Sequence, residues 1–557
     1  MKPKILKIFG PPGTGKTHAL LEFVKERVIK NQVDISQIGY FSFTRIAKEE
    51  GLIRGSKALG VSADKLKSSF RTLHSYAIDN KVASLGNLKP MLAEHYEQFS
   101  VEKISPNLKG IKVKVDSIDS GIMYTSSPHL KIIERARSRC ISVKEEFNEG
   151  NHPGFVHRDD VEYVANALEE WKENKGFIEY SDFIKRAIEK GVCPHLDSIF
   201  IDEAQDLTPL LWKFVNLLVN NSENVFIAGD DDQAIYHWNG GDVNTFINYE
   251  GEEIVLRQSR RLPRQIVDLS KITINRIRGN RKEKEFSPRK DPITNKEVVG
   301  NIFYRGSYDF KFSEGTWLIM GRTREIIKPF AANLRALGFF YSYMGHLPKG
   351  VESALEALKN WEKLMKGESI SHEAVLKVYS LIKTKKKDSS DNGIEYGLKT
   401  VVESKFDKNK LYSLSHLKEQ GGLHVDTGRP WYEILNKINE ETNYYIQTLH
   451  TKGEDLTKDP RIRVATFHSS KGAEADNSIV SLSFNSLPLK TFQKSPSIQR
   501  RDEEVRVFYV GTTRSKYNLY FLRPENSKES YNRELFGGKL EDIIKEIKSK
   551  SFEQDEE

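Results

Sequence analysis

Residues 10–17 read GPPGTGKT and stand between two segments of different pattern. The preceding ILKIF (5–9) is a short apolar run, whereas the following HALLEFVKERVIK (18–30) has apolar residues at helical spacing. The order is therefore strand, glycine-rich loop and helix, which is the setting that the phosphate-loop pattern GxxxxGK[ST] requires. This stretch predicts an α/β domain built around a nucleotide-binding loop.

The chemistry of this loop depends on its small residues and on its last two side chains. Glycines allow backbone N–H groups to turn inward around phosphate oxygens, and the N-terminus of the next helix adds partial positive charge. Lys16 can then reach the β- and γ-phosphates of a nucleoside triphosphate, and the Thr17 hydroxyl can bind Mg²⁺. The predicted nucleotide-binding residues are Gly10, Pro11, Pro12, Gly13, Thr14, Gly15, Lys16 and Thr17.

An acidic motif further along the chain supplies the partner of this loop. SIFIDEAQD (198–206) is an apolar strand with Asp202 and Glu203 at its carboxyl end. Asp202 is predicted to hold the Mg²⁺, and Glu203 to act as the base toward the attacking water. Adjacent acids at a strand end are common, but together with the phosphate loop they indicate a P-loop NTPase that uses Mg²⁺.

Other apolar runs alternate with helical stretches and predict two parallel α/β sheets. Strands are expected at 5–10, 38–44, 195–206 and 223–230 in the first sheet, and at 314–323 and 461–470 in the second. Residues 505–522 are expected to form the end of a helix, a turn and a further strand. Polar, helix-rich segments interrupt each core, and the first of them contains no strand-like run. The expected organisation is a first core at 1–75 and 178–253 with an insertion at 76–177, a second core at 254–346 and 458–525 with an insertion at 347–457, and a C-terminal helix and acidic tail at 526–557.

Composition limits the protein class only loosely. The 557 residues carry 86 lysines and arginines against 78 acids, a net charge of +8 that permits a nucleic-acid partner without requiring one. No apolar run approaches the roughly 20 residues of a membrane span. Cys140 and Cys193 form neither a metal-ligand spacing nor a disulfide framework, so we expect a protein of the reducing cytoplasm.

Residues 229–241, GDDDQAIYHWNGG, belong to a series of motifs. GPPGTGKT, IDEAQD, GDDDQAIYHWNGG, LRQSRRLP, VATFHSSKGAEAD and VRVFYVGTTRS follow one another in that order. The series resembles the superfamily 1 helicases of the UvrD/Rep/PcrA type. That resemblance implies two RecA-like domains with ATP between them and single-stranded DNA across the top of both.

The resemblance gives the 229–241 segment two tasks. Gln233 would contact the γ-phosphate and the attacking water, while Tyr236 and Trp238 would stack on DNA bases. Stacking accepts any base and contributes roughly 1–3 kcal/mol per base, which suits a motor that moves along arbitrary sequence. A buried core tryptophan is the alternative for Trp238.

Arginines of two further motifs would complete the ATP site. Arg261 in LRQSRRLP matches the arginine of the fourth motif, and Arg514 in YVGTTRS matches an arginine finger. Glu474 corresponds to a glutamate that links this site to the DNA-binding loop. Arg260 replaces a tyrosine that stacks on adenine in relatives, and its guanidinium could stack there instead. For either motif arginine alone, a surface salt bridge would be the simpler interpretation.

Five further positions match DNA-contacting residues of the family. They are Phe43 and Thr44 in SFTRIA, His74 in TLHSYA, and Thr466 and His468 in ATFHSSKG. Contacts of this kind to phosphates position the strand without reading its sequence. A histidine satisfied within a loop is the alternative for His74 and His468.

The chain also departs from the family pattern. Only nine residues precede Gly10, so the adenine-recognising glutamine segment of relatives has no counterpart in the sequence, and Asn239 stands where relatives often have arginine. The insertion at 347–457 is shorter than in larger relatives. A strand-separating hairpin would fall at 523–536, where Tyr531 is a candidate wedge and a plain loop the alternative.

The expected function is an ATP-dependent DNA helicase that moves 3′ to 5′ on single-stranded DNA and opens partially duplex DNA. A translocase that displaces proteins or needs a partner, an ATP-switched nucleic-acid clamp, and RNA as the track are the alternatives. The predicted location is the cytoplasm, whether the protein is encoded by a cell or by a virus, and the nucleoid if it is bacterial. The motifs do not identify any protein partner, so protein partners stay unknown.

Overall fold

A computed structural model describes residues 3–78, 86–119, 121–150, 152–191, 193–306, 310, 312, 314–385, 392–395, 406–484, 498–524 and 526–553. By their contacts, the residues divide into two compact units. The first comprises 1–306, 470–474 and 482–557, and the second comprises 307–469 and 475–481. In the described parts of the chain, no helix is long and apolar enough to cross a membrane.

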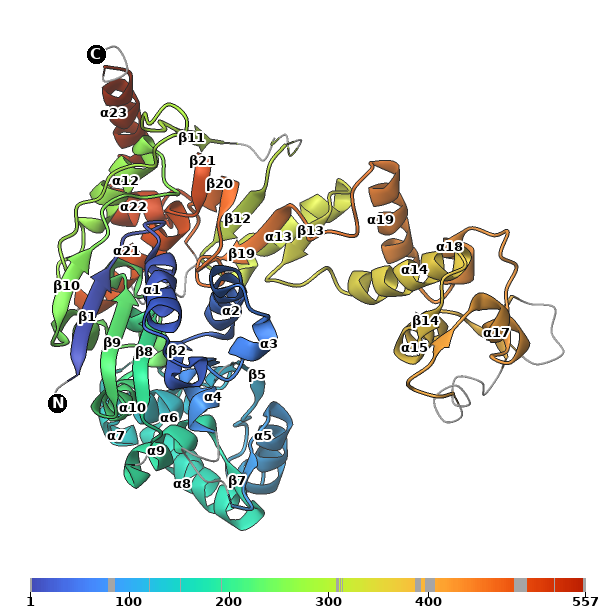
Figure 1. The fold of residues 1–557 in the computed structure, drawn as a ribbon, viewed down its shortest axis with the longest axis horizontal. Coiled ribbons are helices and arrows are strands. Elements are labelled where there is room, and N and C mark those ends of the chain that lie inside the picture. The colour runs from blue at the N-terminus through green and yellow to red at the C-terminus, as the bar shows by residue number, and fades with distance from the viewer. Residues whose placement is uncertain are drawn as a thin grey trace. The chain divides into compact units, whose positions relative to one another are not determined.

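The first unit is built on a six-stranded sheet in the order β10-β1-β9-β8-β2-β3 (Figure 1). Its strands are β10 (Glu252–Val255), β1 (Lys4–Phe9), β9 (Ser222–Gly229), β8 (Leu196–Asp202), β2 (Ile38–Ser42) and β3 (Phe70–Thr72). All of the pairings are parallel, so the carboxyl ends of β1, β8 and β9 meet at one edge. That edge carries the phosphate loop and the acidic motif, where ligands of open parallel sheets bind.

The predicted strands of this sheet are confirmed at 4–9, 38–42, 196–202 and 222–229. Strands β3 and β10 were not predicted from the sequence. Because β3 has only three residues and β10 begins with two acids, neither shows the apolar run by which the other strands were recognised.

Helices cover both faces of the first sheet. They are α1 (Lys16–Lys25), which continues as a π-helical turn (Glu26–Lys30), α2 (Arg45–Leu59), α3 (Ala63–Leu66), α4 (Leu73–Ala77), α9 (Tyr180–Lys190), α10 (Pro209–Asn220) and α11 (Val243–Asn248). Thr208 caps α10 through its hydroxyl and Pro209 takes the first helical position, which explains the sharp start of this helix. The core beneath α1 includes stacked rings of Phe200 and Phe226, whose centroids lie 4.7 Å apart.

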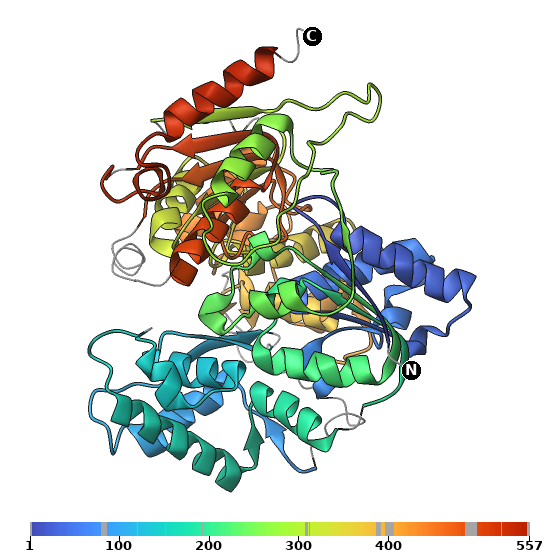
Figure 2. The same cartoon turned by 90° about the vertical axis from the view of Figure 1, so that its left-hand side faces the viewer.

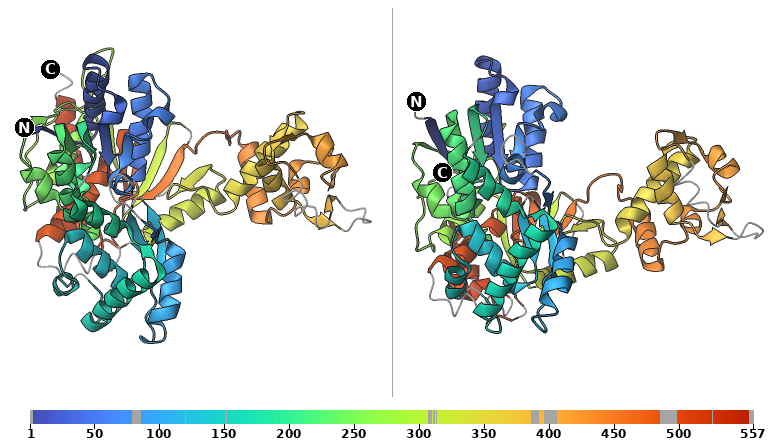
Figure 3. Two further views of the ribbon diagram at one scale, coloured as in Figure 1. Left: turned by 60° about the horizontal axis from the view of Figure 1, so that its bottom comes forward. Right: turned by 90° about the horizontal axis from the view of Figure 1, so that it is seen from below.

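The segment between α4 and α9 has a hydrophobic core of its own, which contains Trp171 and Phe99. It comprises β4 (Lys89–Pro90), α5 (Ala93–Phe99), a π-helical turn (Ser100–Ile104), β5 (Val115–Asp119), β6 (Ile122–Thr125), α6 (Pro128–Arg139), α7 (Val143–Asn148), α8 (Arg158–Lys175) and β7 (Phe177–Ile178). Figure 3 shows these helices gathered together. The segment is mainly helical, as predicted, but the expectation that it has no strands is wrong, because β5 and β6 form an antiparallel hairpin.

The second sheet has the order β11-β21-β20-β12-β19-β13. Its strands are β11 (Asn301–Arg305), β21 (Ser515–Leu522), β20 (Ala475–Ser481), β12 (Trp317–Gly321), β19 (Ile462–Thr466) and β13 (Tyr341–Tyr343). The registers of β11 with β21 and of β12 with β19 and β20 are parallel, as is that of β13 with β19. The fold is therefore α/β with two RecA-like parallel sheets, as predicted from the sequence.

Further helices belong to the first unit. They are α12 (Arg264–Ile274), α21 (Ile498–Thr512), α22 (Tyr531–Phe536) and α23 (Leu540–Glu553). The predicted C-terminal helix is confirmed, and Figure 2 shows it next to the C-terminus. It packs on α12 and β11, and its Leu540, Ile544 and Ile547 are buried.

The interpretation of Tyr531 as a strand-separating wedge is wrong. This tyrosine is fully buried, its ring stacks on Phe484 with centroids 4.5 Å apart, and its hydroxyl donates to Glu504 at 2.9 Å. Its position as the first residue of α22, capped by Ser530, makes it part of the core.

The second unit adds helices around its strands. They are α13 (Arg324–Ala336), α14 (Val351–Met365), α15 (His372–Ser380), α17 (Leu414–Glu419), α18 (Trp431–Ile434) and α19 (Glu440–Thr451). Short strands lie between them: β14 (Ile370–Ser371), β15 (Thr384–Lys385), β16 (Gly393–Glu395), β17 (Leu411–Tyr412) and β18 (Leu423–His424).

Candidate active site

The phosphate loop leaves the end of β1 and closes on itself. Gly13 and Gly15 have φ angles of +74° and +89°, a left-handed conformation that lets the backbone turn around a phosphate. The Thr14 hydroxyl donates to the Pro11 carbonyl at 2.8 Å, and Lys16 Nζ donates to the Gly10 carbonyl at 2.7 Å. The loop therefore has the cradle shape that its sequence predicts.

Two predicted magnesium ligands touch each other at the end of β8. Thr17 Oγ1 donates to Asp202 Oδ2 at 2.8 Å, so a hydroxyl and a carboxylate oxygen share one point of the site. Mg²⁺ prefers such oxygen ligands and is usually bound by one or two carboxylates together with substrate phosphates. The residues present fit this ion. Among the described residues, no cluster of three or more His, Cys, Asp or Glu that could hold a metal is found.

Tyr40 is a member of this site that sequence reasoning missed. It lies on β2 beside β8, is fully buried, and donates its hydroxyl to Asp202 Oδ2 at 2.7 Å. Burial raises the pKa of Asp202, as does the neighbouring Glu203, whereas the bonds from Tyr40 and Thr17 oppose that rise. The signal in the sequence was only an apolar strand containing one tyrosine.

The candidate base follows directly in the chain. Glu203 has a φ angle of +55°, which is unusual for a residue with a side chain and bends the chain sharply after β8. Gln205 donates its amide to the Glu203 carboxylate. Burial raises the pKa of Glu203, but Lys471 and Lys16 outweigh burial and leave the pKa below its ordinary value. The carboxylate is thus kept ionised, as a base must be.

Gln233 and Arg514 are brought together although 281 positions separate them. Gln233 ends a short 3₁₀ turn (Asp231–Gln233) after β9, and its Oε1 accepts from Arg514 at 3.0 Å. Its Nε2 donates to Asp230 Oδ2 at 2.6 Å. Arg514 follows α21 and is only 1% exposed, and burial, helped by Arg261, lowers its pKa to about 9. Both polar ends of the Gln233 amide are therefore held.

The LRQSRRLP segment packs directly on the phosphate loop. The Ser259 hydroxyl donates to the Pro12 carbonyl at 3.0 Å, and the Arg260 N–H donates to the Gly13 carbonyl at 2.8 Å. A Cβ at Gly13 would meet Arg261 Cβ at 2.4 Å, so the packing leaves no room for a side chain there. Arg260 places its exposed side chain near Gly15.

Arg261 and Glu474, which their motifs each assign to the ATP site, form an ion pair with each other. Arg261 Nε lies 2.8 Å from Glu474 Oε2, and Lys516 Nζ lies 2.7 Å from Glu474 Oε1. Burial raises the pKa of Glu474, but Arg261 and Lys516 outweigh it and lower that pKa to about 2. The carboxylate is charged at any physiological pH, and it holds Arg261 in place.

A second residue missed from the sequence is Lys471, within the quoted SSKGAEAD string. Its Nζ donates to the Asp206 carboxylate and to the Gln233 carbonyl, and it lies 3.7 Å from Glu203 Oε2. It also lies 5.3 Å from the centroid of the Tyr236 ring. Lys471 therefore contacts both the candidate catalytic residues Glu203 and Gln233 and the predicted DNA-stacking residue Tyr236.

The predicted DNA-stacking aromatics differ in exposure. Trp238 is 37% exposed, which excludes the core alternative, and its ring lies 6.0 Å from that of Tyr236. Tyr236 is 9% exposed and meets Phe43 edge-on at 5.4 Å, with Phe43 itself 2% exposed. Of these three aromatics, Trp238 alone presents substantial ring surface in this conformation, and the other two support it.

The remaining predicted DNA contacts lie in several elements. Thr44 caps α2, its Oγ1 accepting from the Ala47 N–H at 3.2 Å. His74, in α4, is buried, and burial lowers its pKa to about 4, so it is neutral at physiological pH. In the second unit, Thr466 Oγ1 and Ser469 Oγ lie 2.9 Å apart at the end of β19, and His468 is half-buried in the same turn.

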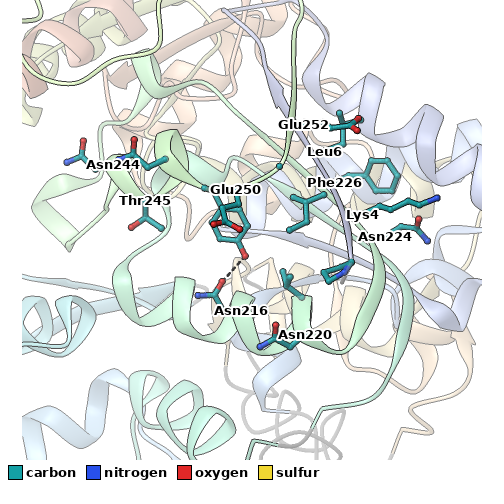
Figure 4. A pocket seen from close by; sticks show the side chains of 16 residues that line it. Lys4, Leu6, Asn216, Asn220, Asn224, Phe226, Asn244, Thr245, Glu250 and Glu252 are labelled. Atoms are coloured by element: carbon teal, nitrogen blue, oxygen red, sulfur yellow. Dashed lines mark hydrogen bonds between the residues drawn. The ribbon is translucent and has the colours of Figure 1, made fainter. Parts of the chain in front are cut away.

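A hollow of about 1260 Å³ lies elsewhere on the first unit. Its lining includes Pro3–Leu6 and a group of asparagines: Asn216, Asn220, Asn224, Asn244 and Asn248. One of them, Asn216, accepts a hydrogen bond at its Oδ1 from the Tyr249 hydroxyl at 2.7 Å, which Figure 4 draws as a dashed line. The hollow opens at the amino end of β1, whereas Gly10 follows the carboxyl end, so it is separate from the nucleotide site.

Taken together, a phosphate loop, an acidic strand end, a glutamine and a buried arginine meet in a chain with two parallel-sheet cores, which defines a P-loop NTPase. Residues 3–253 match the family model of the UvrD/REP helicase N-terminal domain. Together with the relatives described next, this match supports a superfamily 1 helicase of the UvrD/Rep/PcrA type.

Several curated relatives match this chain along most of its length at low identity. The putative ATP-dependent DNA helicase YjcD of Bacillus subtilis (strain 168) is 21% identical over 617 residues, covering 95% of this chain and 78% of the relative. The ATP-dependent DNA helicase Rep of Buchnera aphidicola subsp. Schizaphis graminum is 21% identical over 629 residues, covering 95% of this chain and 92% of the relative.

Other matches are shorter. The ATP-dependent DNA helicase PcrA of Leuconostoc citreum is 34% identical over 287 residues, covering 48% of this chain. The chain spans 37% of that protein's length, and 45% of the probable DNA helicase II homolog of Mycoplasma capricolum.

Proposed function

We propose that this protein is an ATP-dependent DNA helicase that moves 3′ to 5′ on single-stranded DNA and opens partially duplex DNA. The observation that carries the proposal is the short segment 233–238. At one end Gln233 bonds to the buried Arg514, and at the other the Trp238 ring is exposed. The proposed contact with the γ-phosphate and the proposed contact with single-stranded DNA therefore lie on the same short segment.

The hydrolysis step follows from the residues already described. Lys16 and the loop N–H groups neutralise the β- and γ-phosphates, and Glu203, ionised by its surroundings, accepts a proton from the attacking water. Arg514 and Arg261 stabilise the charge that develops on the transferred phosphoryl group. Mg²⁺, held by Thr17 and Asp202, would polarise the phosphate oxygens.

Coupling to DNA is carried by the same segment. Loss of the γ-phosphate removes a hydrogen-bond partner of Gln233. The resulting change in the position of Gln233 is transmitted to Tyr236 and Trp238 through the short 3₁₀ turns of this segment. The strength with which Trp238 stacks on a DNA base would therefore change with each cycle of hydrolysis. Because stacking is independent of base identity, the step can be repeated on any sequence.

The decisive experiment offers the protein two duplexes, one with a 3′ single-stranded tail and one with a 5′ tail, while ATP consumption is recorded. Opening of the 3′-tailed duplex alone supports the proposal, and opening of the 5′-tailed duplex alone contradicts the direction. A duplex whose single-stranded tail is RNA tests whether the protein requires DNA, because base stacking alone does not distinguish RNA from DNA.

A single-stranded-DNA translocase that displaces proteins, or needs a partner to unwind, is the second candidate. The observation that favours it is the burial of Tyr531, the residue that sequence reasoning offered for strand separation. ATP consumption and removal of a bound protein block from single-stranded DNA, without opening of either duplex, would select it. We place either activity in the cytoplasm.

A further inference from the structure

Three consecutive carboxylates, those of Asp230, Asp231 and Asp232, are buried immediately before Gln233. One lysine meets all three. Lys284 Nζ lies 3.2 Å from Asp230 Oδ1 and 3.0 Å from Asp232 Oδ2, and it also bonds to Asp231 Oδ1. The Lys284 side chain is only 1% exposed. A buried ammonium of this kind is stable only where carboxylates pair with it, so its position is strongly determined.

Further polar groups hold the same carboxylates. Arg281 donates to both oxygens of Asp232 at 3.0 Å, and the Lys282 N–H donates to Asp231 Oδ2 at 2.8 Å. The segment that carries these residues is thereby fastened to the end of β9. Its preceding residues are fastened to α21, where Asp502 accepts from the N–H groups of 278 and 279 at 3.0 and 2.7 Å.

The network reaches the catalytic glutamine through one carboxylate. Asp230 uses Oδ1 for Lys284 and Oδ2 for Gln233 Nε2, at 3.2 and 2.6 Å. Because Asp230 can only accept when ionised, the amide NH₂ of Gln233 must face it, and the amide oxygen must face Arg514. A turn of the Asp230 carboxylate would release Gln233 to rotate.

We propose that Lys284 is a positioning residue for ATP hydrolysis, which holds the Asp230 carboxylate and through it orients the Gln233 amide toward Arg514. The inference rests on the proposed function, since it takes Gln233 and Arg514 as members of the hydrolysis site. Lys284 itself lies behind the site and touches neither nucleotide nor DNA in this assignment.

The test compares Lys284→Met with Lys282→Met as a matched control, because the Lys282 ammonium bonds to the partly exposed Glu253 and not to the three aspartates. We expect Lys284→Met to lower kcat of DNA-stimulated ATP hydrolysis about 10- to 100-fold, as for a misplaced catalytic group, with KM for ATP changed less than about threefold. The control should keep its kcat within about twofold of the wild type. Wild-type kcat in a folded Lys284→Met protein would overturn the proposal.

A double-mutant comparison separates positioning from a general structural effect. If Lys284 acts through Gln233, then Gln233→Ala already removes what Lys284 provides, and adding Lys284→Met should slow hydrolysis less than about threefold more. A double variant whose loss of kcat equals the product of the losses in the two single variants would overturn the proposal. Circular dichroism melting checks that each variant is folded.

Where Lys284→Met fails to fold, the variant Asp231→Asn with Lys284→Met takes its place, because it removes one carboxylate charge with the lysine. The same comparison with Gln233→Ala then decides. All readouts are of ATP hydrolysis, so a wild type that consumes ATP with DNA but opens neither duplex overturns the helicase proposal and leaves this test intact. A wild type that consumes no ATP overturns both.

Discussion

Replacement of Tyr40 by phenylalanine tests the metal side of the site with a minimal change. The substitution removes one hydroxyl, which donates to Asp202 Oδ2 at 2.7 Å, and leaves the ring stack on Phe70 at 4.6 Å in place. A hydrogen bond to a charged group contributes about 1.5–3 kcal/mol. Since every 1.4 kcal/mol is tenfold in an equilibrium constant, the Mg²⁺ concentration for half-maximal hydrolysis should rise roughly 10- to 150-fold.

The variant should also change the pH profile in a defined direction. Burial already raises the pKa of Asp202, and the Tyr40 bond opposes that rise, so its removal raises the pKa of Asp202 further. A protonated carboxylate cannot hold the metal. The acid limb of kcat/KM should therefore move to higher pH in Tyr40→Phe, whereas activity well above that limb recovers when Mg²⁺ is raised.

The assay is steady-state ATP hydrolysis with saturating single-stranded DNA over a Mg²⁺ series at several pH values. Tyr96→Phe is the matched control, because Tyr96 is also a buried tyrosine that donates to a buried carboxylate, Glu179, but it lies in the insertion. The control should lose stability without any change in Mg²⁺ requirement. An unchanged Mg²⁺ midpoint and acid limb in a folded Tyr40→Phe protein would refute the assignment of Asp202 to the metal.

Three other predictions follow from the same geometry. Lys16→Ala should abolish hydrolysis, because the β,γ-phosphates lose their main cationic side chain; normal turnover in a colorimetric phosphate assay would show that the site is elsewhere. Trp238→Ala should weaken DNA-stimulated hydrolysis and raise the DNA concentration for half-maximal stimulation about 5- to 150-fold, from about 1–3 kcal/mol of stacking, with the DNA-free rate kept; equal loss of both rates would contradict a role on the track. Arg514→Ala should lower kcat by about 10³- to 10⁵-fold while ATP-analogue binding, followed by fluorescence, changes little; a loss of binding with kcat unchanged would argue for a ground-state contact.

Local sequence was sufficient for the parts of this site that are contiguous in the chain. The phosphate loop needs glycines, a lysine and a threonine at fixed offsets, and its backbone geometry is imposed by residues within the same eight positions. The acids at the end of β8 were found for the same reason, since a buried strand that ends in two carboxylates is visible as a pattern. Trp238 was predicted by its motif and is in fact exposed.

Two residues that act across the fold, Tyr40 and Lys471, were not found in this way. Tyr40 is 162 positions from Asp202, and Lys471 is 265 positions from Asp206. Their pairing depends on which strand lies beside β8 and on which loop returns to the site, and no local pattern specifies either. The wedge interpretation of Tyr531 failed for a related reason, because position after a motif does not tell whether a ring faces water or the core.

The amino-acid sequence by itself determined the class of fold, the nucleotide loop and its acidic partner, since these arise from short-range periodicity and from the steric freedom of a few glycines. Only the tertiary structure decided that the three aspartates at 230–232 are buried against Lys284 rather than exposed on a turn. Like charges repel when they are considered alone, and their burial is stable because the fold brings Lys284 and Arg281 against them.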